Sequence, residues 1–181
     1  MEYISTKISG VWILEPKVFA DPRGYFMESY KKEEFNKLIA PVNFIQDNES
    51  KSSYGVLRGL HFQTGDTAQA KLVRVVQGAV LDVAVDIRPG SPTFGKHVAV
   101  ELSAENKKQL FVSRGLAHGF LVLSKTAVFN YKVDNHYSPS TEQTLYCFDP
   151  ELAIQWPVEE RKLILSEKDR QGKFLKDLSV L

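Results

Sequence analysis

The chain has 181 residues, 43% of them hydrophobic, which is enough for one domain with a sizeable core and excludes an intrinsically disordered chain. Its 23 lysines and arginines nearly balance its 22 aspartates and glutamates, so it lacks the basic excess that is typical of nucleic-acid binding. Cys147 is the only cysteine, which excludes an intrachain disulfide. We find neither a secretory signal in residues 1–10 nor a membrane-spanning stretch, and we therefore expect a soluble cytoplasmic protein.

The N-terminal part of the chain predicts short strands, one turn and one helix. Residues 11–18 favour one or two strands, and the Asp-Pro-Arg-Gly sequence of residues 21–24 indicates a turn that leads into extended chain over residues 25–30. Residues 31–40 form the one clear amphipathic helix pattern. Residues 44–50 change from apolar to polar, and their amide side chains either bind a ligand or bond their own loop backbone.

The rest of the chain predicts β-structure. Residues 71–76 and 79–87 flank Gln77-Gly78 and predict a β-hairpin, whose second arm alternates apolar and polar residues with a period of two. Glycine and proline turns separate the many short strands, and there is little helix. This pattern predicts an all-β fold, a sandwich or barrel of the jelly-roll kind, in a single domain of residues 1–181. Further strands are expected at residues 96–102, 111–112, 115–123 and 127–133.

The stretch Arg58-Gly59-Leu60-His61-Phe62-Gln63 is the first candidate for chemistry. Side chains alternate along a strand, so Arg58 and His61 point to opposite faces unless a bend intervenes. Gly59 permits such a bend, as a bulge or a turn. With the bend, one residue holds an anion while the other transfers protons beside it. The alternative is a strand end with a hydrogen-bonded histidine.

Metal and nucleophile chemistry fit the sequence poorly. Cupin metal sites typically use His-x-His in one strand and a later Gly-x-x-His, and the chain has the second half of this pattern at Gly115 to His118. Gln63 stands two positions after His61, where a second histidine is needed, so we predict no metal. Cys147 lies between two aromatic residues, and no serine occupies a nucleophile elbow.

Acid–base chemistry remains. His61 is a suitable base near neutral pH, and Asp169 is either its orienting carboxylate or simply the last residue of a helix capping box that begins at Ser166. Lys71 lies in an apolar strand, where it needs an anionic partner such as a developing enolate. Tyr131 is a candidate acid or an ordinary core tyrosine with its hydroxyl at the edge.

A series of short motifs spans nearly the whole chain. In order, they read Phe19-x-Asp21-x-Arg23-Gly24-x-Phe26-x-Glu28, Gln46-Asp47-Asn48, Arg58-Gly59-Leu60-His61-Phe62-Gln63, Gln69-x-Lys71-Leu72-Val73-Arg74, Asp82-Val83-x-Val85-Asp86-Ile87-Arg88, Ala117-His118-Gly119-Phe120, Tyr131-Lys132 and Ser166-Glu167-Lys168-Asp169. With these motifs the chain resembles the dTDP-4-dehydrorhamnose 3,5-epimerases of dTDP-L-rhamnose synthesis. Departures from the usual family sequence, at residues 64–66 and 113–114, fall in turns. The resemblance implies a jelly-roll cupin-type fold with a few short peripheral helices and no metal.

The same resemblance implies a role for each motif residue. His61 is expected to remove the protons next to the C4 ketone, with Asp169 as its partner. Tyr131 is expected to return a proton from the opposite face, and Lys71 to stabilise the enolate oxygen. No redox step occurs, so no cofactor is expected. The residues implied to bind the nucleotide sugar are Arg23, Phe26, Glu28, Gln46, Asp47, Asn48, Arg58, Lys71, His118, Tyr137, Glu142 and Lys168.

The resemblance also implies the partners of the chain. The expected substrate is dTDP-4-keto-6-deoxy-D-glucose, converted to dTDP-4-keto-L-rhamnose, and the expected assembly is a homodimer that exchanges N-terminal strands. No nucleic acid and no membrane partner are expected. Two alternatives stay open: a related nucleotide-sugar enzyme of similar fold that inverts only C3 or only C5, and a non-catalytic sugar-binding cupin. The joint presence of a base and an acid disfavours the second, because binding alone needs neither.

Overall fold

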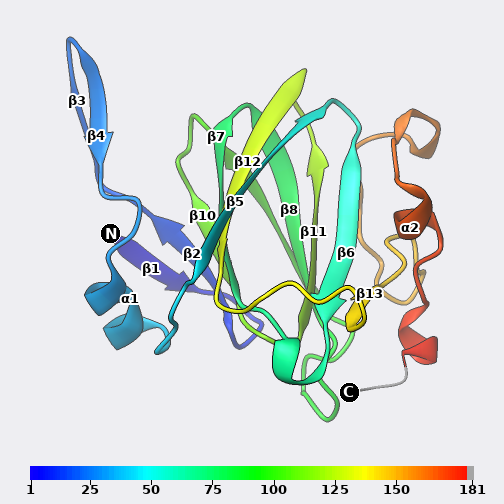
Figure 1. Ribbon diagram of the computed structural model, residues 1–181. Helices are drawn as coiled ribbons and strands as arrows, with labels where there is room; N and C mark the ends of the chain where they lie inside the picture. Colours follow the sequence, from blue (N-terminus) through cyan, green and yellow to red (C-terminus); the bar gives the residue numbers. More distant parts are fainter. Residues whose placement is uncertain (179–181) are drawn as a thin grey trace.

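A computed structural model describes residues 1–178 and has two antiparallel sheets that face each other (Figure 1). The six-stranded sheet has the order β1 (Glu2–Ser5), β2 (Val11–Glu15), β10 (Gln109–Val112), β7 (Lys71–Gln77), β12 (Thr126–Val133) and β5 (Gln46–Ser53). The five-stranded sheet has the order β13 (Glu142–Thr144), β6 (Leu57–Gln63), β11 (Leu116–Val122), β8 (Ala79–Asp86) and β9 (His97–Ser103). The predicted all-β, jelly-roll cupin-type fold is confirmed. The last three residues of the expected domain, 179–181, lie outside the described residues.

The remaining elements are short and lie at the periphery. The strands β3 (Val18–Asp21) and β4 (Gly24–Met27) form a separate two-stranded hairpin. Five helical elements complete the described chain: α1 (Lys32–Leu38), α2 (Glu167–Arg170) and the 3₁₀ turns η1 (Gly65–Thr67), η2 (Glu160–Lys162) and η3 (Leu175–Asp177). Helix α1 confirms the amphipathic pattern, since Phe35 is its buried residue. No helix within residues 1–178 is long and apolar enough to cross a membrane.

Three apolar clusters hold these layers together. Between the sheets, Val73 and Phe129 of the six-stranded sheet pack with Val80 and Phe120 of the five-stranded sheet. The outer face of the five-stranded sheet is covered by the C-terminal segment, which contributes apolar residues between positions 145 and 178. Helix α1 covers the outer face of the six-stranded sheet through Phe35. Strand β8 is therefore buried on both faces, which explains its nearly continuous apolar sequence.

The predicted hairpin between residues 71–76 and 79–87 is wrong. The two strands form as expected, but β7 belongs to the six-stranded sheet and β8 to the five-stranded sheet. Gly78, with φ +77°, carries the chain from one sheet to the other, and a Cβ there would lie 2.1 Å from the carbonyl oxygen of Thr126. Two apolar arms around Gln-Gly are equally typical of a hairpin and of a corner between packed sheets, so the local sequence does not separate them.

Two other segments differ from the sequence expectation. The polar residues 46–53 form strand β5, which the sequence did not predict; β5 is the edge strand of its sheet, next to β12, so an exposed and polar sequence is tolerated. Strand β1 was not predicted, and it is the opposite edge of the same sheet. Glu142 lies at the start of the short strand β13.

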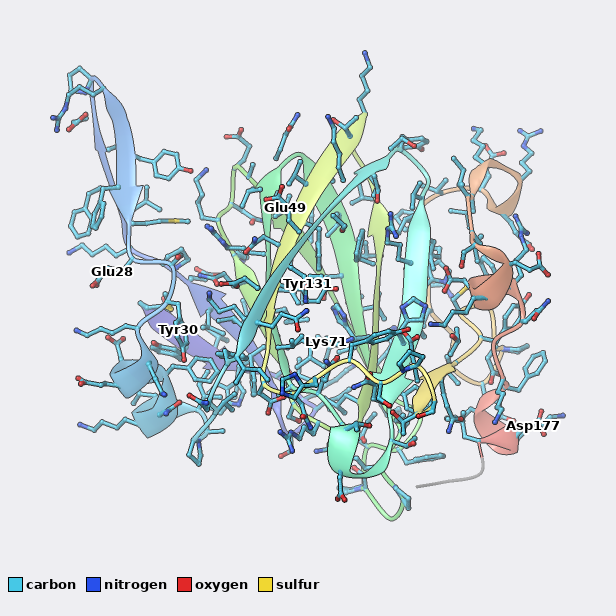
Figure 2. The ribbon with its side chains drawn as sticks, in the orientation of Figure 1. Glu28, Tyr30, Glu49, Lys71, Tyr131 and Asp177 are labelled. Atoms are coloured by element: carbon cyan, nitrogen blue, oxygen red, sulfur yellow. The ribbon has the colours of Figure 1, made fainter. Side chains whose placement is uncertain are left out.

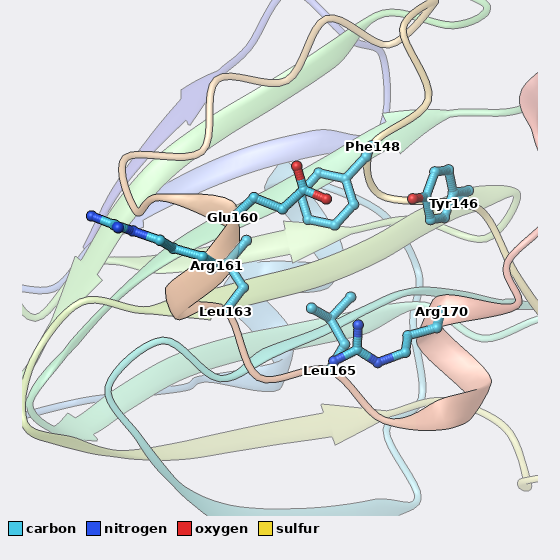
Figure 3. A pocket seen from close by; sticks show the side chains of 7 residues that line it. All are labelled: Tyr146, Phe148, Glu160, Arg161, Leu163, Leu165 and Arg170. Carbon is cyan, nitrogen blue, oxygen red and sulfur yellow. The ribbon is translucent and has the colours of Figure 1, made fainter.

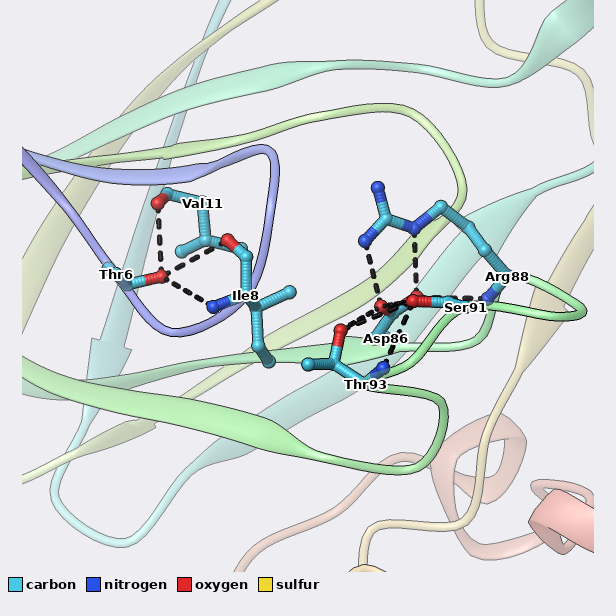
Figure 4. Close-up of polar contacts among 7 residues, drawn as sticks. All are labelled: Thr6, Ile8, Val11, Asp86, Arg88, Ser91 and Thr93. Atoms are coloured by element: carbon cyan, nitrogen blue, oxygen red, sulfur yellow. Dashed lines mark hydrogen bonds and ion pairs between the residues drawn. The ribbon is translucent and has the colours of Figure 1, made fainter.

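The loop after β8 is fixed by a single buried carboxylate (Figure 4). Asp86 accepts hydrogen bonds from the side chains of Arg88, Ser91 and Thr93, at 2.6–2.8 Å. Burial acts to raise the pKa of Asp86, but these bonds outweigh it and hold the pKa far below its usual range. Because Asp86 is paired with Leu116 across the strands, this loop also anchors the start of β11, the strand that carries His118. Figure 4 also shows Thr6, which closes the turn between β1 and β2.

The β3–β4 hairpin projects away from both sheets (Figure 1). Its strands pair only with each other, and its large apolar side chains are exposed, with exposed fractions of 52% for Phe19, 56% for Tyr25 and 65% for Phe26. A two-stranded hairpin alone is marginally stable in water, and exposed aromatic residues gathered on it are typical of an interaction surface.

Candidate active site

A pocket of about 160 Å³ opens between the two sheets. It contains the acid–base residues expected from the sequence, and Figure 2 shows Lys71 and Tyr131 in the space between the layers. A larger hollow of about 600 Å³ lies beneath the C-terminal segment (Figure 3) and is lined by Tyr146, Phe148, Glu160, Arg161, Leu163, Leu165 and Arg170. None of the expected catalytic residues lines this larger hollow, so we place the candidate site in the smaller pocket. Its lining residues are Ser50, Arg58, His61, Lys71, His118, Gly119, Phe120, Phe129 and Tyr131.

A bulge in β6 turns Arg58 and His61 toward the same pocket. His61 is paired with His118 of β11, whereas Arg58 is paired with Phe120, so β6 has one more residue than β11 between the two pairs. Gly59, with φ +119°, allows the two strands to approach closely, because a Cβ on it would lie 2.6 Å from the Cα of Gly119. The bend expected at Gly59 is confirmed.

His61 and Asp169 form a close pair, although they are 108 positions apart. Nε2 of His61 lies 2.5 Å from Oδ1 of Asp169, whose residue is only 3% exposed. Asp169 also belongs to the cap of α2: its backbone N–H donates to Ser166 Oγ at 3.2 Å, and the Ser166 hydroxyl donates to Oδ2 at 2.7 Å. The two explanations offered for Asp169 therefore hold together. The cap fixes the carboxylate that contacts the histidine.

The charge state of Asp169 decides which ring nitrogen of His61 faces the pocket. Burial acts to raise the pKa of Asp169, but hydrogen bonds from His61 and Ser166 outweigh it and lower the pKa. An ionised carboxylate can only accept hydrogen bonds, so Nε2 of His61 is the nitrogen that carries the proton. Nδ1 of the neutral ring is then free to take a proton from a substrate.

Lys71 places an ammonium group in the pocket, and the pKa of this group is lowered. Burial lowers its pKa to about 8, while the negative charges of Glu142 and Asp82 act in the opposite direction and the positive charge of Lys168 acts with burial. The ammonium is therefore mostly protonated at neutral pH. A desolvated ammonium stabilises an oxyanion more strongly than the same group in water.

Tyr131 lies on the wall opposite His61. It belongs to β12 of the six-stranded sheet, whereas His61 belongs to β6 of the five-stranded sheet, and both line the pocket. Burial raises the pKa of Tyr131, Glu142 adds to the effect, and only Arg58 opposes it. The phenol therefore keeps its proton at neutral pH. An imidazole and a phenol thus face one space from two sheets.

The expected binding residues near the pocket fall into two groups. At the start of β13, Glu142 forms an ion pair with Lys168 and accepts a hydrogen bond of 2.7 Å from the hydroxyl of Tyr137. On β5, Asn48 is paired with Tyr131 and so shares its inward face, and it accepts a 2.7 Å hydrogen bond from Gln46. The two groups lie beside the pocket, where side-chain amides and charges can contact a nucleotide sugar.

Asp47 lies apart from these groups. It is paired with Lys132 and forms an ion pair of 2.8 Å with it, on the face of the sheet opposite that of Tyr131. Its direct contact with a substrate stays a prediction that this geometry does not favour. Sequence reasoning did not single out Ser50, which lines the pocket, or Asp82, which contacts His118 at 2.9 Å. The signal for Asp82 was a charge within a strand buried on both faces.

The hairpin residues are far from the pocket of their own chain. Arg23 has an 89% exposed side chain, and its ion pair is with Asp21 at 2.6 Å on the same turn. Phe26 is 65% exposed, and Figure 2 shows Glu28 well separated from Lys71 and Tyr131. A single chain does not bring these residues to the site.

Two packed sheets with a histidine and a tyrosine on facing walls of one pocket are the arrangement of a cupin-type jelly-roll enzyme. Residues 5–177 match the family model described as dTDP-4-dehydrorhamnose 3,5-epimerase. The dTDP-4-dehydrorhamnose 3,5-epimerase of Escherichia coli K12 is 54% identical over 172 residues, which cover 94% of this chain and 92% of that protein. The chain belongs to the dTDP-4-dehydrorhamnose 3,5-epimerase family, as its motifs predicted.

Solved structures agree with this assignment. The dTDP-4-dehydrorhamnose 3,5-epimerase of Elizabethkingia anophelis NUHP1 is 53% identical, with a TM-score of 0.94 and 98% of each chain covered. A dTDP-6-deoxy-D-glucose-3,5-epimerase of Legionella pneumophila Philadelphia 1, in complex with dTDP-4-keto-L-rhamnose, is 48% identical, with a TM-score of 0.94 and 98% and 94% of the two chains covered. A relative matched by sequence, a dTDP-4-dehydrorhamnose 3-epimerase of Streptomyces niveus, is 40% identical over 169 residues, which cover 93% of this chain and 81% of that protein.

Proposed function

We propose that this chain inverts C3 and C5 of dTDP-4-keto-6-deoxy-D-glucose to give dTDP-4-keto-L-rhamnose. The observation that carries the proposal is the placement of His61 and Tyr131 on opposite walls of one pocket, with Lys71 beside them. Inversion of a carbon needs a proton to leave one face and another to arrive on the other face. Facing walls supply these two directions.

The proposed reaction begins with proton removal at the carbon next to the C4 ketone. Nδ1 of His61 takes the proton, the C–H bonding electrons form a carbon–carbon double bond, and the carbonyl electrons move to the oxygen as an enolate. The hydroxyl of Tyr131 then gives a proton to the opposite face of the same carbon, and the ketone forms again. His61 then gives its extra proton to water and the phenolate of Tyr131 takes one up from water, so both groups return to their starting states.

Stabilisation of the enolate is the difficult part of this reaction. A proton next to a ketone is a weak acid and imidazole is a modest base, and each pKa unit of mismatch costs roughly 1.4 kcal/mol. Lys71 places an ammonium with a pKa of about 8 in the pocket, where its charge can offset part of this cost. We assign it to the enolate oxygen.

We assign the nucleotide sugar to the groups around the pocket. Charge-assisted hydrogen bonds from an arginine are well suited to phosphate oxygens, and Arg58 lines the pocket. The remaining proposed contacts within one chain are Gln46, Asp47, Asn48, His118, Tyr137, Glu142 and Lys168. Of these, Asp47 has the weakest geometric support, because it faces the other side of its sheet.

We propose further that the chain acts as a homodimer that exchanges N-terminal strands, with residues 1–181 of each chain as one domain. The support is the exposed β3–β4 hairpin, which carries aromatic side chains and Arg23 away from its own sheets. In the dimer this hairpin reaches the pocket of the second copy. Arg23, Phe26 and Glu28 then contact the substrate there, so each complete site contains residues of two chains.

A coupled assay tests the function. The chain is incubated with dTDP-4-keto-6-deoxy-D-glucose, NADPH and a 4-ketoreductase that accepts only the inverted sugar. We expect NADPH oxidation that depends on this chain and that His61→Ala does not support. A related enzyme that inverts only C3, as the name of the Streptomyces niveus relative indicates for that protein, releases a different product that NMR identifies. Absence of NADPH oxidation with the folded native chain contradicts the proposal.

A further inference from the structure

A second histidine–carboxylate pair lies at the pocket, and the proposed proton transfer does not use it. Nε2 of His118 lies 2.9 Å from Oδ1 of Asp82, and the exposed fractions of the two side chains are 6% and 0%. They come from the neighbouring strands β11 and β8, which pair along their full length. Within residues 1–178, the second carboxylate oxygen of Asp82 is buried and accepts no hydrogen bond.

A structural role alone does not account for this carboxylate. Residues of a strand alternate between faces, so Asp82 lies on the same face of β8 as Val80 and Ala84, which belong to the apolar core between the sheets. A fully buried carboxylate with one hydrogen-bond partner loses more solvation than it regains. An apolar side chain at position 82 would pack there without this cost. This loss of solvation free energy therefore indicates that the Asp82 carboxylate has a function at the pocket.

The geometry of this pair repeats that of the first. His61 and His118 lie directly opposite each other in the register of β6 and β11, and each contacts a buried carboxylate through Nε2. An ionised carboxylate accepts the proton of Nε2, which leaves Nδ1 of a neutral ring as an acceptor. In the part of the chain that the structure describes, no protein group bonds Nδ1 of His118, whose ring lines the pocket.

We propose that Asp82 is a positioning residue: it holds His118 with the proton on Nε2, so that Nδ1 accepts a hydrogen bond from a hydroxyl of the hexose ring. Asp82 does not touch the sugar. The two histidine–carboxylate pairs thus have different roles. Nδ1 of His61 accepts a proton from carbon, whereas Nδ1 of His118 accepts a hydrogen bond that orients the sugar ring. The inference rests on the proposed epimerase function, which names the sugar that enters the pocket.

The first test measures the native protein without any turnover. The chain has four histidines, and the imidazole ¹⁵N signals of His118 are assigned by their loss in His118→Asn. We expect the native signals to show the proton on Nε2 and a bare Nδ1. A proton on Nδ1, whether in the other tautomer or in an imidazolium, overturns the proposal even if the epimerase activity is present.

The second test uses Asp82→Asn, which keeps the shape of the side chain. An amide can donate to Nε2 and so shift the ring proton to Nδ1, the same wrong-tautomer effect as in a serine protease triad. We expect the His118 signals to change accordingly. KM for the keto sugar should rise roughly 10- to 100-fold, with a much smaller change in kcat, because a donor then faces the sugar hydroxyl. Asp82 is also a charge that favours protonated Lys71, so kinetics are compared at pH 7, below the Lys71 pKa of about 8.

Asp149→Asn is the matched control. Asp149 is also a buried carboxylate, with 4% exposure, but it accepts from the backbone N–H of Leu175 and Glu151 outside the pocket. We expect no change in KM or in the His118 signals of this variant, even if its thermal stability falls. If Asp82→Asn shifts the tautomer without raising KM, or raises KM with the tautomer unchanged, the proposal is wrong. The native ¹⁵N measurement decides the matter if Asp82→Asn does not fold.

Discussion

The pocket between the sheets and the β3–β4 hairpin are opposite in construction. In the pocket, His61 and His118 are each fixed by a buried carboxylate, and the neighbouring Phe120 and Phe129 rings stack at 4.1 Å. On the hairpin, the aromatic side chains are exposed and Arg23 forms its ion pair with the carboxylate two residues before it. One chain therefore fixes the residues that we propose for proton transfer. In the proposed homodimer, the hairpin of the second copy completes the binding of the nucleotide.

Loss of the base should have the largest effect. His61→Ala removes the imidazole that Asp169 contacts, and with it the proposed base. We therefore expect exchange of both substrate protons with solvent to be abolished. Deuterium incorporation at C3 and C5, followed by NMR in D2O, measures this directly. Exchange at the native rate in the folded variant would show that the base is another group.

Loss of the acid should separate two rates that the native enzyme couples. Tyr131→Phe removes only the hydroxyl, so His61 should still exchange substrate protons on its own face. Formation of the inverted product should fall by roughly 10²- to 10⁴-fold more than exchange, which is the usual contribution of a placed acid. If exchange and inversion fall together, Tyr131 shapes the pocket or stabilises the enolate rather than delivering a proton.

The two arginines test the division between pocket and hairpin. A charge-assisted hydrogen bond contributes about 1.5–3 kcal/mol, so Arg58→Ala and Arg23→Ala should each weaken dTDP binding by roughly 10- to 150-fold. Isothermal titration calorimetry with dTDP measures both. Unchanged affinity in both variants would place the nucleotide elsewhere.

Mixed dimers test whether Arg23 acts in the pocket of its own chain or in that of the second copy. Arg23→Ala and His61→Ala chains are unfolded together and refolded, which gives heterodimers in about half of the molecules. If Arg23 serves the partner's pocket, one site of each heterodimer has both residues intact, and about a quarter of the native activity at low substrate concentration should return. If Arg23 serves its own pocket, every heterodimer site lacks either Arg23 or His61, and mixing restores no activity.

The smallest expected effect is a pH dependence of kcat/KM that arises from Lys71 in the pocket. Lys71 has a lowered pKa of about 8, so it is protonated below that pH and loses its charge above it. We expect kcat/KM to fall by up to about tenfold per pH unit above pH 8, as the charge that stabilises the enolate disappears. Lys71→Arg keeps its charge and should remove this fall, whatever its effect on the plateau. A native profile that stays flat to pH 10 would contradict the role of Lys71.

Much of the fold was predictable because its causes are local. Alternation along residues 79–87, the amphipathic pattern of residues 31–40 and the turn at residues 21–24 are each visible in a few neighbouring positions. The assignment of β7 and β8 to different sheets was not, because Gln77-Gly78 is compatible with both a hairpin and a corner between sheets. The outcome depends on the pairing of β7 with β10 and β12 and of β8 with β11, strands that are distant in sequence.

The site, like the fold, was predictable from the sequence only where neighbouring residues determine it. Gly59 indicated the bend that brings Arg58 and His61 together, and the bulge opposite β11 produces it. The pairing of His61 with Asp169 came from family resemblance, since local sequence explained Asp169 equally well as a helix cap. Asp82 was missed because its meaning depends on a histidine of the neighbouring strand. Contacts across strands decide function here, and periodicity alone does not reveal them.

Inversion of both carbons in one pocket can be tested in a single experiment. The native chain is incubated with dTDP-4-keto-6-deoxy-D-glucose in D2O, the product is trapped by a 4-ketoreductase, and its ring protons are examined by NMR. We expect deuterium at both C3 and C5, with both centres inverted. Deuterium and inversion at only one carbon would identify a single-centre epimerase, and a product without deuterium would contradict proton transfer altogether.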